Sequence, residues 1–141
     1  MSSIDVFDRN IISYHLYICC KANDAARVLK TTLAKRQLTK GMKNLPTIRT
    51  HNGPQFVSKL LCETCKSLKL IHQKIPVKTP NMNAHIESFH AILEKDCYSR
   101  NEFISYLDVY ETVSNYMNHY NNRYRHGSLD DRPSAEFHKS L

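Results

Sequence analysis

The amino-acid sequence predicts a single α/β domain over residues 1–141. In some segments every second residue is apolar, which indicates strands, and in others apolar residues recur every three or four positions, which indicates helices. The two kinds of segment alternate along the chain. The length of 141 residues suits one compact domain and is too short for two. Hydrophobic residues make up 41% of the chain, which is enough for a core.

The first third predicts two strands and a helix. Residues 4–7 resemble the end of one strand, and a turn leads into a second strand over residues 11–19. One face of this second strand is predicted to carry Ile12, Tyr14, Leu16 and Ile18. A helix from about residue 24 to 38 follows, capped by Asn23 or Asp24. Its buried stripe is predicted to be Ala25, Val28, Leu29, Thr32 and Leu33.

The middle third begins with a basic loop over residues 40–46 and a short strand over 47–50. A turn follows at residues 51–56, because Asn-Gly-Pro interrupts regular structure strongly. The next helix is predicted to run to about Leu68, and residues 70–75 to form a further strand. This helix is predicted to bury Phe56, Leu60, Leu61, Cys65 and Leu68.

The last part of the chain predicts two helices and a tail. After a loop over residues 76–83, a helix over 84–98 is predicted to bury Ile86, Phe89, Leu93 and Cys97. A second helix over 102–122 is predicted to bury Phe103, Leu107, Tyr110, Val113, Met117 and Tyr120. Residues 123–141 contain Gly and Pro and are predicted to form a docked loop.

The chain is basic, with a net charge of +7 that is concentrated in its first two thirds. A basic surplus favours contact with a polyanion such as nucleic acid, although a merely soluble basic protein would show the same charge. No run of 18 apolar residues occurs and the first residues do not resemble a signal peptide, so we expect a cytoplasmic protein that does not enter the membrane.

The five cysteines are an odd number, which favours reduced thiols over a disulfide framework. Cys62 and Cys65 form a CxxC pair. A zinc site would need two further ligands, and Cys65 falls on the apolar stripe of its helix, so we expect core cysteines.

Two motifs carry most of the functional information. The first is HNGPQF at residues 51–56, and the second is NAHIES at residues 83–88. Thirty-five residues separate His51 from Glu87. With the flanking segments IRTHNGPQF and TPNMNAHIESFH, and the later YNNRYRHGSLDDRPSAEF, the chain resembles the Asp-Asp-Glu integrase core of insertion-sequence transposases and retroviral integrases.

The resemblance implies a ribonuclease H-like fold, a mixed sheet flanked by helices. It also implies DNA strand transfer with Mg²⁺ or Mn²⁺, transposon ends and target DNA as partners, and a bacterial, nucleoid-associated location. The resemblance further implies that the protein forms oligomers with a second copy of itself or with a full-length transposase. Because Mg²⁺ prefers oxygen ligands, three carboxylates supply the metal site in the family.

The chain departs from the family pattern in two ways. His51 stands where the family has its second catalytic Asp. The first catalytic Asp lies on a strand upstream of the segment that resembles residues 4–16, so we expect the chain to be truncated at its N-terminus and to lack that central strand. Glu87 is then the only catalytic acid, and the only metal ligand, that carries over. The plainer interpretations are that His51 is an exposed turn residue and that Glu87 is a first-turn acid favoured by the helix dipole.

Polar and basic side chains around the second motif are candidates for DNA contact. They are Lys74, Lys78, Asn81, Asn83, His85 and His90, each of which could equally be a solvated surface residue. The sequence therefore predicts a transposase or integrase core domain that is catalytically impaired or inactive. The alternatives are a non-catalytic DNA-binding or dimerising remnant of a transposase, and an unrelated basic α/β binding module.

Overall fold

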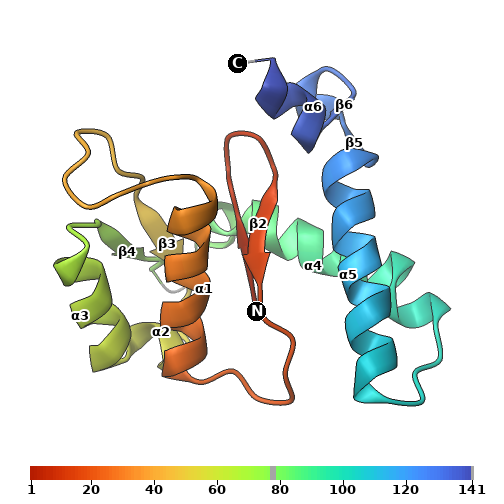
Figure 1. Cartoon of the computed structure of the whole chain (residues 1–141), viewed down its shortest axis with the longest axis horizontal. Coiled ribbons are helices and arrows are strands. Elements are labelled where there is room, and N and C mark those ends of the chain that lie inside the picture. Colours follow the sequence, from red (N-terminus) through yellow and green to blue (C-terminus); the bar gives the residue numbers. More distant parts are fainter. Residues whose placement is uncertain (77–78, 141) are drawn as a thin grey trace. The chain divides into compact units, whose positions relative to one another are not determined.

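The computed structural model describes residues 1–76 and 79–140 (Figure 1). Its contacts divide the chain into two compact units. Unit 1 contains Met1–Ser3 and the described part of Ile12–Ala84, and unit 2 contains Ile4–Ile11 and the described residues from His85 onward. Helices and short strands alternate along the chain, which confirms the predicted mixed α/β class.

The strands of the described residues pair two by two. β1 (Ser2–Ile4) pairs with β2 (Ile11–Tyr14), and β3 (Ile48–Thr50) pairs with β4 (His72–Lys74). The third pair lies near the C-terminus. We expected one mixed sheet, and the three separate pairs differ from that expectation because no hydrogen-bonded ladder joins β1–β2 to β3–β4 within the described ranges.

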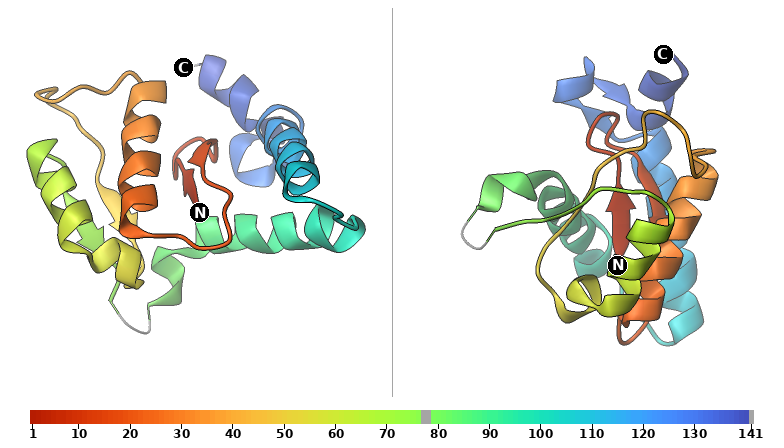
Figure 2. Two further views of the ribbon diagram at one scale, coloured as in Figure 1. Left: turned by 60° about the horizontal axis from the view of Figure 1, so that its bottom comes forward. Right: turned by 90° about the vertical axis from the view of Figure 1, so that its left-hand side faces the viewer.

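Unit 1 is built around α1 (Ala22–Lys35), which packs against α3 (Lys59–Ser67) (Figure 2). The apolar side of each helix contributes to one core with Leu70. The buried members of this core are Ala25, Ala26, Leu29, Leu33, Leu61, Cys65 and Leu70. The predicted stripe of the first helix is thus confirmed, since Val28 and Thr32 are buried as well. Cys65 is 2% exposed, which agrees with a core cysteine.

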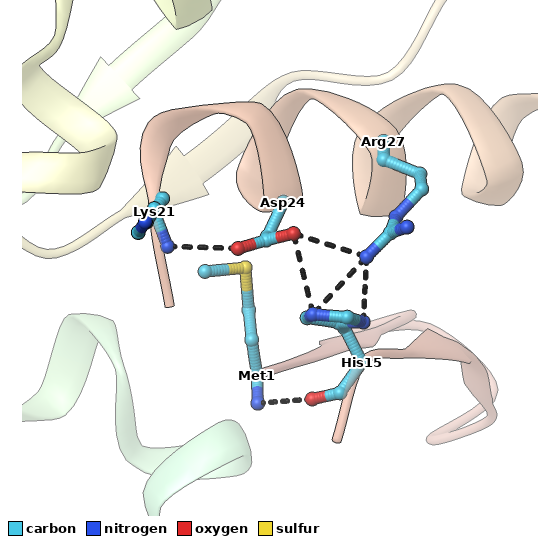
Figure 3. A network of polar contacts seen from close by, with 5 residues as sticks. All are labelled: Met1, His15, Lys21, Asp24 and Arg27. Atoms are coloured by element: carbon cyan, nitrogen blue, oxygen red, sulfur yellow. Dashed lines mark hydrogen bonds and ion pairs between the residues drawn. The ribbon is translucent and has the colours of Figure 1, made fainter. Parts of the chain in front are cut away.

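The N-terminus of α1 is fixed by Asp24 (Figure 3). One carboxylate oxygen accepts from the Lys21 backbone N–H at 2.9 Å, and the other lies 3.0 Å from the Arg27 guanidinium and 3.2 Å from Nε2 of His15. The pKa of Asp24 is lowered mainly by the backbone hydrogen bond from Lys21, and to a smaller extent by the charges of His15 and Arg27. The helix therefore begins at Ala22 with Lys21 as its N-cap, and not with Asn23 or Asp24 as the cap, as the sequence predicted.

The second strand is shorter than predicted and differs in its buried face. β2 ends at Tyr14, and Ile18, which was predicted to share the apolar face of the strand with Ile12, is 95% exposed. Ser13 is buried instead, since its hydroxyl donates to the Val28 carbonyl at 3.0 Å and lies 2.6 Å from the Thr32 hydroxyl. The polar side of the strand thus faces the α1 backbone, and local hydrogen bonding overrides the apolar alternation.

The helix predicted after the first motif is broken in two. α2 (Pro54–Val57) ends at Ser58, whose backbone is extended and whose hydroxyl accepts from the Leu61 N–H at 3.3 Å as the N-cap of α3. Leu61 is buried, as predicted, whereas Leu60 is 40% exposed, contrary to the prediction, because the break turns the second helix. β4 is also shorter than the predicted strand.

Unit 2 holds α4 (Ala84–Asp96, whose first residue belongs to unit 1) and α5 (Tyr106–Asn122), with a short 3₁₀ turn at Tyr98–Arg100 between them. Its buried apolar residues include Phe89, Leu93, Cys97, Val113, Met117, Tyr120 and Leu129. Phe89, Leu93 and Cys97 of the stripe predicted for the first helix are confirmed, whereas Ile86 is only half-buried. The N-terminal part of the second stripe is wrong, because Leu107 is 63% and Tyr110 is 47% exposed.

The tail contains regular structure and is not a loop. β5 (Arg125–His126) pairs antiparallel with β6 (Arg132–Pro133), a 3₁₀ turn (Gly127–Leu129) lies between them, and α6 (Ser134–Lys139) packs against α5. Two successive residues in the left-handed region, Asp130 and Asp131, allow the chain to reverse before β6. Within the described chain, no helix is both long and apolar enough to cross a membrane.

Candidate functional site

The first motif follows the parallel pair of β3 and β4 in unit 1. Arg49 stands opposite Gln73 in the register, and the pair is closed at its far end by the Ile75 N–H, which donates to the Thr50 carbonyl at 2.9 Å. Both strands therefore end at the same edge. In open α/β sheets ligands bind at the carboxyl ends of the strands, and His51 is the residue that follows β3 there.

His51 is exposed and forms part of a tight turn. Its Nδ1 accepts a hydrogen bond from the Gly53 backbone N–H at 2.9 Å. Its ring packs edge to face against the ring of Phe56, with 4.8 Å between the two ring centroids. A carboxylate oxygen at this position would accept the same N–H in an Asx turn. The imidazole thus accepts the hydrogen bond that a carboxylate would accept here, but it offers a nitrogen in place of a charged oxygen donor.

The glycine of the motif leaves room for this ring. A Cβ added to Gly53 would lie 2.6 Å from Cε1 of His51 and 2.9 Å from Oε1 of Gln55. The φ of Gly53 is −62°, so the reason for glycine here is the close approach of the imidazole and not backbone conformation.

Two polar side chains tie this edge together. The Asn52 amide donates to the Ile75 carbonyl at 2.8 Å, and Arg49 donates to Oε1 of Gln73 at 3.0 Å and to the Met82 carbonyl at 3.2 Å. Arg49 therefore connects β3 to the 3₁₀ turn Pro80–Met82, which leads into the second motif. Arg49 was not among the site residues predicted from the sequence. The feature that could have pointed to it is its place as a basic residue in a short strand directly before the first motif.

The DNA-contact candidates of unit 1 lie around the same edge. Lys74 is the last residue of β4 and is exposed, and Asn81 is exposed within the 3₁₀ turn. Asn83 is half-buried just before α4. Lys78 lies outside the described residues. Burial lowers the pKa of His72, and the positive charge of Lys74 lowers it further.

The second motif lies at the start of α4. Glu87 is the acidic residue of the first turn and is exposed, as are His85 and His90. With 100° between successive residues, Glu87 and His90 share a face of the helix and His85 lies on another. His51 belongs to unit 1 and these three residues to unit 2, and each is placed within its own unit.

The donors do not fit a magnesium site. Over residues 1–76 and 79–140, no group of three or more His, Cys, Asp or Glu side chains is arranged to hold a metal ion. Nδ1 of His51 is engaged by the Gly53 N–H, which leaves only one nitrogen for a ligand. Mg²⁺ prefers several oxygen ligands, and an imidazole nitrogen is a poor substitute for a carboxylate.

Comparison with known proteins matches residues 68–133 to the family described as "Integrase core domain". Residues 68–133 belong to the integrase core family. This segment contains Glu87, the two motif histidines and most of the C-terminal signature, whereas His51 precedes it. The match confirms the resemblance found in the sequence and contradicts the interpretation as an unrelated basic module.

Two curated relatives come from bacterial insertion elements. An uncharacterised 39.2 kDa protein of insertion element IS476 from Xanthomonas euvesicatoria is 30% identical over 90 residues, and an uncharacterised 31.7 kDa protein of IS407 from Burkholderia multivorans is 26% identical over 90 residues. Each alignment covers 64% of this chain. The alignments cover 26% and 32% of the two relatives, so the chain spans only a part of their length.

A solved structure shares the fold. A chain in the cryo-EM structure of the simian T-cell lymphotropic virus intasome, determined in complex with the PP2A regulatory subunit B56 gamma, matches with a TM-score of 0.78 and 20% identity. The match covers 98% of this chain and 47% of that one. The chain therefore shares its fold with a component of a retroviral intasome.

Proposed function

We propose that residues 1–141 form one integrase-core domain of the ribonuclease H-like type, derived from an insertion-element transposase, which binds DNA but does not itself catalyse strand transfer. The match of residues 68–133 to the integrase core supports the transposase origin. The shared fold with an intasome chain supports the fold type. DNA, either transposon ends or target, is the proposed partner, in a bacterial, nucleoid-associated setting.

The observation that carries the proposed loss of catalysis is the His51 turn. Family members use divalent metals, and two such ions near a phosphodiester require negative ligands. Two unit charges at 4 Å interact with about 4 kcal/mol at an effective dielectric of 20, so the loss of one carboxylate beside doubly charged ions is a large penalty. By analogy with the loss of one electrostatic stabiliser, the rate should fall by roughly 10²–10³ or more.

The test is a strand-transfer assay with labelled transposon ends and Mg²⁺ or Mn²⁺, combined with a DNA-binding measurement. We expect the chain to bind DNA with a salt-dependent affinity and to give no transfer product. Lys74→Gln should weaken binding evenly across sequences, because a phosphate contact carries no base information. Lys59→Gln removes the same charge from an exposed helix position of unit 1 and is the matched control.

His51→Asp is the decisive variant. The carboxylate can accept the Gly53 N–H as Nδ1 does, so we expect an unchanged fold and stronger binding of Mn²⁺. Transfer by the unmodified chain that Glu87→Gln abolishes would contradict the proposed inactivity. Failure to bind DNA would contradict the proposed role as a whole.

A second candidate, a dimerising remnant, has one specific observation in its favour. Ile104, Tyr106, Leu107 and Tyr110 are all exposed around the start of α5. Contiguous exposed apolar side chains of this kind mark association surfaces. Sedimentation velocity over a concentration series distinguishes this role, because an association through α5 is weakened by Leu107→Gln.

A further inference from the structure

Unit 1 has an open cavity at the amino ends of β3 and β4, whereas the first motif follows their carboxyl ends. The cavity measures about 260 Å³, and the residues around it are Gly41, Met42, Lys43, Leu45, Lys69 and Ile71. Ile71 directly precedes β4, and its carbonyl accepts from the Ile48 N–H of β3 at 2.8 Å. The cavity is therefore separate from the edge at which His51 lies.

A tight turn forms one wall of this cavity. The Met42 N–H donates to the Thr39 carbonyl at 3.3 Å, and Gly41 has a φ of +100°, which glycine adopts without strain. The Thr39 N–H donates to the sulfur of Met42 at 3.3 Å. The Met42 side chain is thus held over the turn, although it is 48% exposed.

The end of α3 forms the other wall. The Lys69 N–H donates to the Lys66 carbonyl at 3.0 Å, and the Leu70 N–H donates to the Cys65 carbonyl at 2.9 Å. These two bonds are those of a Schellman motif, in which Lys69 occupies the left-handed position with a φ of +58°. Leu70 and Cys65 belong to the core of unit 1, so the backbone of Lys69 is anchored at the surface between them.

Positive charge around the cavity is not balanced locally. Residues 25–86 contain twelve Lys and Arg and one acid, Glu63. The carboxylate of Glu63 already lies 3.7 Å from the ammonium group of Lys59. This part of the sequence therefore has no carboxylate left to balance Lys43 and Lys69, which are both exposed.

The size and lining of the cavity suit the side chain of a partner protein. At about 260 Å³ it is smaller than the roughly 300–1,000 Å³ of typical small-molecule sites, and it is open to solvent. Ile71 is 69% exposed beside the two lysines. An apolar side chain with carboxylates next to it would cover the exposed apolar surface and meet the two ammonium groups.

The start of α5 in unit 2 has these properties. Ile104 is 96% exposed and Leu107 is 63% exposed. Glu111 lies about one turn beyond Leu107 on the same side of the helix, because four residues advance by about 400°. Glu102 lies two residues before Ile104, and both glutamates are exposed. Apolar side chains flanked by carboxylates therefore stand at the surface here.

The charges of the two units are opposite in sign. Unit 1 contains thirteen Lys and Arg against two Asp and Glu, and unit 2 contains seven against eleven. The unit 1 surfaces of two chains therefore repel each other, whereas unit 1 of one chain attracts unit 2 of another. This complementarity favours a second copy of the chain as the occupant of the cavity.

We propose that the start of α5 in one chain docks into the unit 1 cavity of a second copy, with Leu107 against Ile71 and the flanking glutamates against Lys43 and Lys69. The contact rests on the dimerising role proposed above and names its partner surface; it does not depend on DNA binding. The two surfaces differ, so a two-fold symmetric dimer would contain the contact twice. Leu107, which the sequence predicted to be buried, is then covered by a second copy.

The test uses the whole chain and two charge-reversed variants in sedimentation velocity over a concentration series. Lys43→Glu with Lys69→Glu reverses the cavity, and Glu102→Lys with Glu111→Lys reverses the helix. Each double variant should raise the dissociation constant of self-association by about tenfold or more, because like charges then face each other. Added salt should weaken the association of the unmodified chain by screening the opposite charges.

A matched control separates the cavity from net charge. Lys30→Glu with Lys59→Glu makes the same change of charge at exposed positions of unit 1 and should leave the dissociation constant within about twofold of the parent value. Circular dichroism checks the fold of every variant. If Lys69→Glu disturbs the end of α3, Met42→Glu with Lys43→Glu replaces it as the cavity variant, with the same expected loss.

Mixing the two charge-reversed variants distinguishes this contact from a contact between identical surfaces. In the mixture, the unchanged α5 of the cavity variant meets the unchanged cavity of the helix variant. We therefore expect association to return as a complex of the two variants. If the start of α5 instead paired with the same segment of a second copy, the cavity variant alone would associate as well as the unmodified chain.

Three results would overturn the proposal: an unmodified chain that is monomeric at about 100 μM, self-association that survives reversal of the cavity, or a mixture that stays dissociated. A cavity variant that loses DNA affinity but keeps its self-association would show that the cavity binds nucleic acid instead. If Leu107→Gln weakens association and reversal of the cavity does not, the dimerising role stands and the cavity contact fails. Failure to bind DNA would affect only the proposed function.

Discussion

The side chain of Asn121 bonds both backbone groups of Ile11. Its Oδ1 accepts from the Ile11 N–H at 2.8 Å and its Nδ2 donates to the Ile11 carbonyl at 2.9 Å. Asn121 lies near the end of α5, 110 residues further along the chain, and Ile11 is 3% exposed at the start of β2. The amide thus satisfies the edge of a strand as a neighbouring strand would.

Asn121→Ala should destabilise the chain by about 2–3 kcal/mol, because it leaves a buried N–H and a buried carbonyl without partners. Urea unfolding followed by circular dichroism measures the difference. Asn115→Ala, at an exposed position of the same helix, is the control and should change stability by less than about 0.5 kcal/mol. Equal effects of the two substitutions would show that the Asn121 contacts contribute nothing.

The buried hydroxyl pair of unit 1 offers a double-mutant cycle. Ser13 and Thr32 both approach the Val28 carbonyl, at 3.0 and 2.8 Å, and each other at 2.6 Å. Ser13→Ala or Thr32→Val alone should cost about 1–2 kcal/mol, since the remaining hydroxyl loses a partner. The double variant should cost less than the sum of the two, because two apolar groups leave no hydroxyl unsatisfied. Additive losses would contradict coupling between the two hydroxyls.

The exposed and buried halves of α5 should respond differently to truncation. Leu107→Gln should leave the free energy of unfolding within about 0.5 kcal/mol of the parent value, because the side chain is 63% exposed. Val113→Ala should cost about 2 kcal/mol, because Val113 is fully buried. Thermal or urea unfolding of the monomer at low concentration checks both. A large loss for Leu107→Gln would mean that this side chain is covered in solution.

Stability should fall when the pH is lowered. Burial, and then the charge of Arg9, lower the pKa of His126 below its ordinary value of 6.5. Between the folded and unfolded pKa values the unfolded chain binds more protons, so stability is lost as the pH falls through about 6.5 and levels off below the folded pKa. His126→Gln should flatten this part of the profile, and Arg9→Gln should flatten it in part. An unchanged slope in His126→Gln would refute the assignment.

The sequence by itself determined the family and the stripes of two helices. The motif around Glu87 and the C-terminal signature identified the integrase core, because short motifs in fixed order are local information. The buried sides of α1 and α4 followed from a period that any isolated helix shows. The break at Ser58 was not predicted, because the helical spacing of the apolar residues around it hides the fact that Ser58 caps a new helix.

Only the tertiary structure decided which apolar and polar faces are covered. A helical period shows that Tyr110 lies on the same side of α5 as Val113, but it does not show whether a neighbour packs along that side, and Tyr110 is 47% exposed while Val113 is buried. Ser13 is buried because the α1 backbone offers it an acceptor, and the Asn121 amide bonds the Ile11 backbone because α5 and the start of β2 lie in one unit. Such relations join residues far apart in the chain, so no local pattern contains them.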